Sequence, residues 1–364
     1  MLENVITSID QVSTKWITSA LVRSGALTHG TVSSFEIDAG KGNWSTNASL
    51  IIRYTEDAEG LLPQRLFLKM VDTNLGNNQD FDESEVSYYT QDYVDTSGAP
   101  LLQCYDAGYS KELKRYHILL DDVAQTHVEA AAKEPTLEYG TALAEGLAVL
   151  HARWWGAQHL SKARVSMHSA SQIQNFVDTT TLGVEYLLSR FSSEMKPHWQ
   201  GVLYELFAKH PQAMIQRTRN PNGFTLIHGD VGSRNVLVPQ QSDRPIYIID
   251  RQPFQWALTT WLGVYDIAYA IVLDWETETR RKYENIILQR YHEYLIQKGI
   301  LDYSWEQLVN DYRLCVPMCV YITTELFRGD VNERWIHVCL QMFQRALTAC
   351  DDLDCSVLWQ DNLS

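Results

Sequence analysis

Strand patterns and helix patterns occupy different parts of this sequence, and this separation limits the folds open to the chain. Apolar runs of strand length fall at residues 32–37, 50–54, 65–71 and 116–123, after a short helical pattern at 13–24. Helical spacing then dominates, at residues 135–155, 279–298, 305–326 and 332–350. The sequence therefore predicts an α+β fold, with a small antiparallel-sheet lobe in residues 1–120 and a larger, mainly helical lobe in residues 121–364.

Charge and composition restrict the partners of such a chain. With 364 residues, of which 45% are hydrophobic, it can bury a core in each of two lobes. A formal net charge of −15 disfavours nucleic acid and anionic membrane as partners, because both are bound through Lys and Arg. We therefore expect a small-molecule partner. The oligomeric state is left open.

The cysteines and the N-terminal region indicate a reducing compartment. The six cysteines form no CxxC pair and no zinc spacing, so we expect free, buried thiols. The N-terminal residues lack a basic segment, and no apolar run approaches the ~20 residues that span a bilayer. We expect a cytoplasmic protein.

Residues 228–235, which read His-Gly-Asp-Val-Gly-Ser-Arg-Asn, carry the strongest chemical motif. An Asp five residues before an Asn is the spacing of phosphoryl transfer, in which the Asp receives a hydroxyl proton and the Asn oxygen holds a metal ion. Asp230 and Asn235 have this spacing, and a strand, turn and strand then lead to Asp250. One carboxylate and one amide suit Mg²⁺. Each residue alone could be a turn former, but the ordered set favours a catalytic site.

Lys69 lies in an apolar strand, Leu-Phe-Leu-Lys-Met, where an unpaired ammonium would be costly. In kinases such a lysine binds the α- and β-phosphates of ATP and pairs with a Glu on the following helix. A helix over residues 81–89 offers Glu85, with Glu83 as the reserve. The alternative is a lysine whose stem is buried and whose ammonium reaches solvent at a strand edge.

Two backbone segments are candidates for nucleotide binding. Residues 40–45, Gly-Lys-Gly-Asn-Trp-Ser, form a turn that could cover phosphates, with Gly40, Gly42, Asn43 and Ser45 as candidate ligands; an ordinary hairpin turn is the alternative. Residues 119–123 follow a strand that breaks into an acidic turn, where the chain passes between lobes. From their position there, we expect Leu120, Asp121 and Val123 to bind the nucleotide base.

These residues together resemble the aminoglycoside phosphotransferase and choline kinase superfamily. Residues 42–44, 150–155 and 263–269 look most like its ecdysteroid kinase-like branch. The resemblance implies a two-lobed protein-kinase-like fold that uses ATP and Mg²⁺. It also implies that Asp230 receives the acceptor proton and that Asn235 and Asp250 hold the metal. Lys69 would bind phosphates, Glu85 would fix Lys69, and His228 and Asp266 would support the loop.

One position departs from the family pattern. The family usually has an aromatic residue after the metal-binding Asp, whereas Asp250 precedes Arg251. Arg251 could reach a phosphate or an acidic substrate group, but we expect it to pair with a carboxylate at the surface, because most Arg side chains are exposed.

The expected function is an ATP- and Mg-dependent small-molecule O-kinase, and the alternative is a catalytically silent nucleotide-binding scaffold. The acceptor can be an amino sugar, an amino alcohol, a steroid-like alcohol or another hydroxylated metabolite. An aromatic and acidic wall for a cation could come from Trp256, Trp261 and Trp275 with nearby acids, but we expect these tryptophans to belong to the core. We set His151 aside as a structural residue.

Overall fold

The chain divides into two compact units. The structure is a computed structural model that describes residues 5–41, 45–74, 82–160, 166–241, 244–329 and 333–360. The first unit comprises Met1–Asp95, Leu101–Val128 and Leu237–Gln255, and the second comprises Thr96–Pro100, Glu129–Val236 and Trp256–Ser364. This division differs from the single boundary expected at residue 120, because a segment far along the sequence returns to the first unit.

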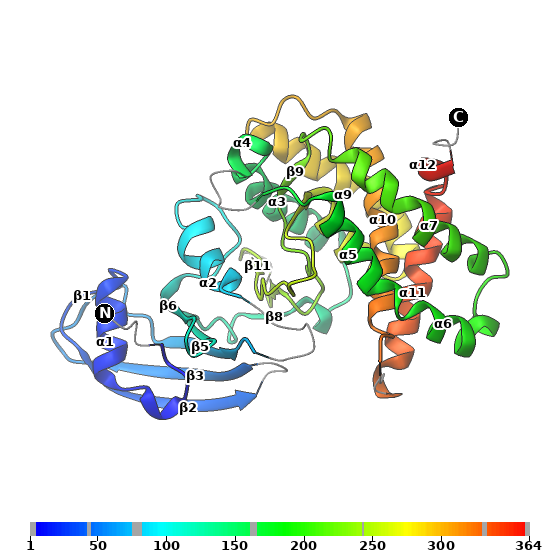
Figure 1. Cartoon of the computed structure of the whole chain (residues 1–364). Helices are drawn as coiled ribbons and strands as arrows, with labels where there is room; N and C mark the ends of the chain where they lie inside the picture. The colour runs from blue at the N-terminus through cyan, green and yellow to red at the C-terminus, as the bar shows by residue number, and fades with distance from the viewer. Residues whose placement is uncertain are drawn as a thin grey trace. The chain divides into compact units, whose positions relative to one another are not determined.

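The first unit contains the antiparallel sheet (Figure 1). Its helical elements are the 3₁₀ turn η1 (Ile9–Gln11), α1 (Thr14–Arg23), α2 (Ser84–Ser87) and the π-helix η2 (Tyr88–Asp92). Its strands are β1 (Leu27–His29), β2 (Val32–Lys41), β3 (Ser45–Tyr54), β4 (Glu59–Gly60), β5 (Arg65–Asp72), β6 (Cys104–Ser110), β7 (Arg115–Asp121), β8 (His127–Glu129), β10 (Val236–Pro239) and β11 (Tyr247–Ile248). The main sheet has the order β2-β3-β5-β7-β6, and a smaller one has the order β11-β10-β8. Pairing of β10 with β8 is what returns residues 237–255 to this unit.

The two faces of the main sheet have different roles. Helix α1 begins after Ser13, whose side chain accepts the amide hydrogen of Trp16, and it ends at Arg23, two residues before Gly25, which has a positive φ. It packs on one face of the sheet, where it joins Leu66, Leu68 and other alternate residues of β3 and β5 in one apolar core. Because successive side chains of a strand point to opposite faces, Lys69 projects from the other face.

The second unit is mainly helical (Figure 1). Its helices are η3 (Ala130–Ala132), α3 (Leu137–Arg153), α4 (Ala157–Leu160), α5 (Ala170–Thr181), α6 (Val184–Phe191), η5 (Ser192–Glu194), α7 (Trp199–Arg217), α8 (Val264–Asp274), α9 (Thr277–Gln297), α10 (Trp305–Glu325), α11 (Glu333–Asp352) and α12 (Val357–Gln360). Its strands β9 (Phe224–Leu226) and β12 (Thr260–Leu262) pair antiparallel. Helix α8 is buried along its length and packs against α10 and α11. It forms the centre of this unit.

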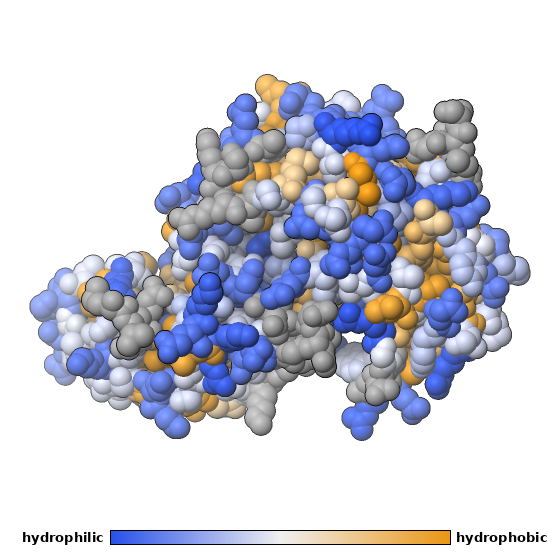
Figure 2. All heavy atoms as spheres, in the orientation of Figure 1, coloured by the Kyte–Doolittle hydropathy of each residue, from blue (hydrophilic) through white to orange (hydrophobic). Residues whose placement is uncertain are grey.

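The predicted α+β class is confirmed, and the predicted strands and long helices occur as β2, β3, β5, β7, α3, α9, α10 and α11. The helix expected at residues 81–89 is shorter: α2 covers four residues and continues as the π-helix η2, and Phe81 lies outside the described residues. No described helix is long and apolar enough to cross a membrane. The face drawn in Figure 2 is mainly hydrophilic, with hydrophobic residues scattered among the polar ones.

Candidate active site

Lys69 lies at the centre of a buried polar cluster in the first unit. Its Nζ lies 2.9 and 2.8 Å from the two carboxylate oxygens of Glu85 and 2.6 Å from Oδ1 of Asp250. The hydroxyl of Tyr116 donates to Glu85, and the amide of Gln252 donates to that hydroxyl. We call Lys69, Glu85, Tyr116 and Asp250 the lysine cluster. Lys69 is only 8% exposed, so it does not reach solvent at a strand edge.

Charge balance explains why Lys69 can be buried. Burial alone would lower the pKa of Lys69, but the charges of Glu85 and Asp250 more than offset this and raise it. Burial also raises the pKa of Glu85, and the Lys69 ammonium opposes that rise. Glu83, the reserve candidate, is exposed and precedes α2, so Glu85 is the residue that pairs with Lys69.

The backbone at Asp250 has an unusual conformation. Asp250 has φ +65°, in the left-handed region that residues with a side chain rarely adopt. Asp250 lies two residues after the end of strand β11 and directly before Arg251. This backbone conformation costs free energy, and it persists only where surrounding contacts hold the residue in place. The hydrogen bond from Lys69 is one such contact.

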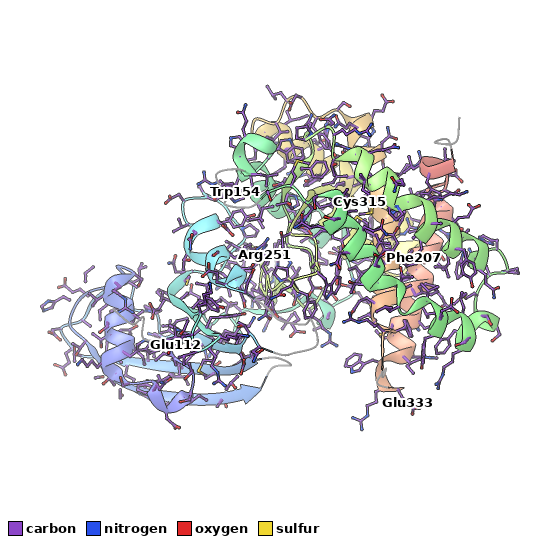
Figure 3. The ribbon with its side chains drawn as sticks, in the orientation of Figure 1. Glu112, Trp154, Phe207, Arg251, Cys315 and Glu333 are labelled. Carbon is purple, nitrogen blue, oxygen red and sulfur yellow. The ribbon has the colours of Figure 1, made fainter. Side chains whose placement is uncertain are left out.

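The expectation for Arg251 was wrong. Arg251 is 3% exposed, and it lies among packed side chains rather than at the surface (Figure 3). Its guanidinium lies 5.9 Å from the ring centroid of Tyr88, and its charge opposes the rise that burial causes in the pKa of Asp92. A guanidinium is planar and weakly hydrated, so it stacks on an aromatic ring inside a protein more readily than an ammonium does.

The two backbone segments assigned to the nucleotide are only partly described. Gly40 is the second-last residue of β2 and Ser45 is the first residue of β3, and Gly42 and Asn43 lie outside the described residues. Leu120 and Asp121 belong to β7, and the carbonyl of Val123 accepts the amide hydrogens of Thr126 and His127 at 2.8 and 2.9 Å. Their binding of a nucleotide stays a prediction.

The second unit holds residues 228–235, which we call the aspartate loop. The loop follows the buried strand β9, and Asp266 of α8 fixes its start. The carboxylate of Asp266 accepts the amide hydrogens of His228 at 2.7 Å and Gly229 at 2.9 Å. Gly229 has φ +83°, which favours a residue without a side chain. His228 in turn accepts the amide hydrogen of Asp230 through Nδ1, at 3.3 Å.

His151, which we set aside at the sequence level, supports the same loop. Its Nε2 lies 3.0 Å from Asp266, and because a carboxylate only accepts, this nitrogen carries a proton. Its Nδ1 lies 2.8 Å from the hydroxyl of Tyr291. Burial would raise the pKa of Asp266, but the bonds and charge of His151, together with His228 and the amide of Gly229, lower it. Asp266 is therefore ionised although it is fully buried.

Asp230 is exposed but held at both carboxylate oxygens. Asn235 donates through Nδ2 to Oδ2 of Asp230 at 3.0 Å and to its carbonyl at 2.8 Å. The hydroxyl of Tyr269 donates to Oδ1 at 2.6 Å. Tyr269 was not among the site residues expected from the sequence, although its place three residues after Asp266 on a helix puts both side chains on one side.

The residues expected to hold Mg²⁺ have suitable chemistry. The amide nitrogen of Asn235 points to Asp230, so its oxygen faces away from that carboxylate. The side chain of Asp250 is 42% exposed and has one oxygen on Lys69. An amide oxygen and a carboxylate are hard ligands that leave room for waters and phosphates, as Mg²⁺ requires. Among the described residues no group of three or more His, Cys, Asp or Glu could hold a metal.

The tryptophans considered for a cation-binding wall belong to the core, as expected. Trp261 and Trp275 are fully buried, and Trp256 stacks on Phe176. Asp274, from the same stretch, accepts the amide hydrogen of Ser233. These residues do not form an open aromatic surface.

Comparison with known proteins identifies the family. The model of the ecdysteroid kinase-like family matches residues 88–301. The chain belongs to the ecdysteroid kinase-like family. This confirms the branch expected from the sequence. A search of curated proteins by sequence gives no match.

Solved structures place the ecdysteroid kinase-like chain in a known fold. The choline kinase of Cryptosporidium parvum Iowa II is 10% identical with a TM-score of 0.56, covering 95% of this chain and 98% of that one. The ethanolamine kinase of Plasmodium vivax is 11% identical with a TM-score of 0.52, covering 86% and 82%. A mutant of aminoglycoside 2'-phosphotransferase-IIIa in its GDP complex is 13% identical with a TM-score of 0.51, covering 93% and 99%. The chain has a two-lobed protein-kinase-like fold.

Proposed function

We propose that this protein is a phosphotransferase that moves the γ-phosphate of ATP to a hydroxyl group of a small molecule. The observation that carries the proposal is Asp230. Its carboxylate is exposed, yet Asn235 and Tyr269 fix both of its oxygens. An exposed carboxylate held in one orientation suits a group that must meet an incoming hydroxyl.

Each conserved role in phosphoryl transfer has a candidate residue. The acceptor oxygen attacks the γ-phosphorus, the bond to the β-phosphate oxygen breaks with its electron pair leaving on ADP, and the hydroxyl proton passes to Asp230. Lys69 would bind the α- and β-phosphates, with Glu85 fixing its ammonium. Asn235 and Asp250 would hold Mg²⁺, which when bound neutralises phosphate charge. Most of the acceleration comes from positioning and electrostatics.

The acceptor class is part of the proposal. The family is named for ecdysteroid kinases, and proteins of similar fold are named for choline, ethanolamine and aminoglycosides. All these compounds carry a hydroxyl group. We therefore place the acceptor among amino alcohols, amino sugars, steroid-like alcohols and similar metabolites, with no nucleic acid or membrane partner. The six free cysteines support action in the cytoplasm.

The alternative is a scaffold that binds nucleotide without turnover. Both hypotheses predict that Mg-ATP raises the melting temperature through linkage. Only the enzyme transfers γ-phosphate. The test is a screen with γ-labelled ATP against a panel of the alcohols above, reading out which compound gains label. A panel without any labelled product, with nucleotide binding intact, would favour the scaffold.

Asp230→Asn separates the two hypotheses at a single residue. The variant cannot take up the hydroxyl proton, so we expect transfer to fall about 10²- to 10⁴-fold, while the Mg-ATP melting shift stays. Asp57→Asn, which changes an exposed carboxylate of the same type, is the matched control and should leave transfer unchanged. Undiminished turnover in Asp230→Asn would remove Asp230 from its role.

A further inference from the structure

Helix α8 holds the aspartate loop at three points. Asp266 binds the start of the loop, Tyr269 binds the side chain of Asp230, and Asp274 accepts the amide hydrogen of Ser233. Steps of three and five residues place the three α8 side chains on one side of the helix. The bonds from the loop to Asp266 come from backbone amides, and Asp274 is bonded by both the backbone and the side chain of Ser233. The contact of Tyr269 reaches the carboxylate that would meet the substrate.

The environment of Tyr269 keeps its hydroxyl a donor. Burial raises the pKa of Tyr269 well above its usual value, and the charge of Asp230 adds to the rise, followed by Tyr265 and Asp274. The ring also packs against the loop: a Cβ added at Gly232 would lie 3.7 Å from Cε1 of Tyr269. The hydroxyl therefore remains protonated, and its position relative to the loop is fixed.

This bond affects the orientation of Asp230. Asn235 holds one oxygen and Tyr269 the other, so the plane of the carboxylate is set by two donors on different sides. A carboxylate held in one orientation suits a group that must take up the proton of an incoming hydroxyl.

We propose that Tyr269 is a positioning residue for phosphate transfer, holding the carboxylate of Asp230 aimed at the acceptor hydroxyl. The inference rests on the proposed function and adds to it a residue that touches neither nucleotide nor acceptor. Tyr269 acts only through Asp230.

The test compares Tyr269→Phe with Tyr265→Phe. Each variant removes one hydroxyl from a buried tyrosine of α8, and the two rings are neighbours, with centroids 6.1 Å apart. Transfer is measured with Mg-ATP and the alcohol that the panel identifies. We expect Tyr269→Phe to lower kcat about tenfold and to leave KM for ATP unchanged. The fall in kcat is smaller than the one expected from loss of the acid–base group itself. Tyr265→Phe should match the wild type.

The outcomes separate a positioning role from a structural one. An unchanged kcat in Tyr269→Phe, a rise in its KM for ATP, or an equal fall of kcat in Tyr265→Phe would overturn the inference. Absence of transfer by the wild type would instead refute the proposed function. The contact can then still be tested by carboxyl ¹³C NMR, with the Asp230 resonance assigned as the one lost in Asp230→Asn. This resonance should shift in Tyr269→Phe and stay in place in Tyr265→Phe, and an unmoved resonance in Tyr269→Phe would overturn the inference in that case too.

Discussion

Replacement of Lys69 by Met tests whether the lysine cluster is an electrostatic unit. Methionine keeps the unbranched stem and removes the charge. Two carboxylates then lose their partner, but not equally. Asp250 is 42% exposed on its side chain, so water compensates most of its loss, whereas Glu85 is 2% exposed and cannot be solvated. An uncompensated buried charge costs about 3–5 kcal/mol of unfolding free energy, so Glu85 determines the effect.

The pH dependence of Lys69→Met identifies the source of that loss. Without the ammonium, the pKa of Glu85 in the folded state rises further above its ordinary value of 4.5. A group whose folded pKa is raised contributes stability below the unfolded pKa and loses it as pH rises through the folded pKa. The deficit of Lys69→Met should therefore be largest at pH 8 and should shrink as pH falls toward 4.5.

Urea unfolding at pH 8 and pH 5 measures this difference, and a double variant provides the control. In Lys69→Met with Glu85→Gln, the buried charge is gone and an amide oxygen remains to accept from Tyr116. We expect most of the stability lost at pH 8 to return. An equal deficit of the single variant at both pH values, with no recovery in the double variant, would refute the reasoning and point to lost packing.

Two further predictions concern the helical unit. His210 is fully buried, and burial lowers its pKa to about 4. The stability that depends on its neutral form is therefore present above pH 6.5 and is lost as pH falls through about 4. The free energy of unfolding should fall by about 3 kcal/mol over this pH range through His210, and this contribution should be absent from His210→Gln. At Gly183 an added Cβ would lie 1.8 Å from the carbonyl oxygen of Thr324, so Gly183→Ala should cost about 3 kcal/mol or more of unfolding free energy. Gly201→Ala, in α7 with no atom within 4 Å, should instead stabilise by about 0.5–1 kcal/mol, and equal effects of the two changes in urea unfolding would contradict the clash.

The sequence predicts elements whose apolar pattern is strong and fails where packing overrides local preference. In β5, the apolar run around Lys69 predicted a buried strand, and Leu66 and Leu68 lie in the core. Helix α7 was missed. It contains Pro211, which normally ends or bends a helix, yet it runs on to Arg217 because its buried side chains pack against neighbouring helices. Strand β6 was missed because its residues are mostly half-buried and show no alternation.

Some parts of the candidate site could likewise be predicted from the sequence, and others could not. The pairing of Lys69 with Glu85 could be inferred, because a lysine in an apolar strand must find an anion nearby. The roles of Tyr269 and His151 could not. A tyrosine or histidine within an apolar helix looks like an ordinary core residue, and only the fold brings it beside Asp230 or Asp266.

Arg251 shows how a departure from the family pattern can still serve the site. Its neighbours in the chain are both tied to the lysine cluster, Asp250 through Lys69 and Gln252 through Tyr116. Arg251 instead contacts the π-helix that continues from the helix of Glu85, where its guanidinium lies over the ring of Tyr88. An aromatic residue at this position would fill space; a guanidinium in addition brings a positive charge close to the partly buried carboxyl of Asp92. These contacts, together with the bond from Lys69, help to hold Asp250 in its left-handed backbone conformation.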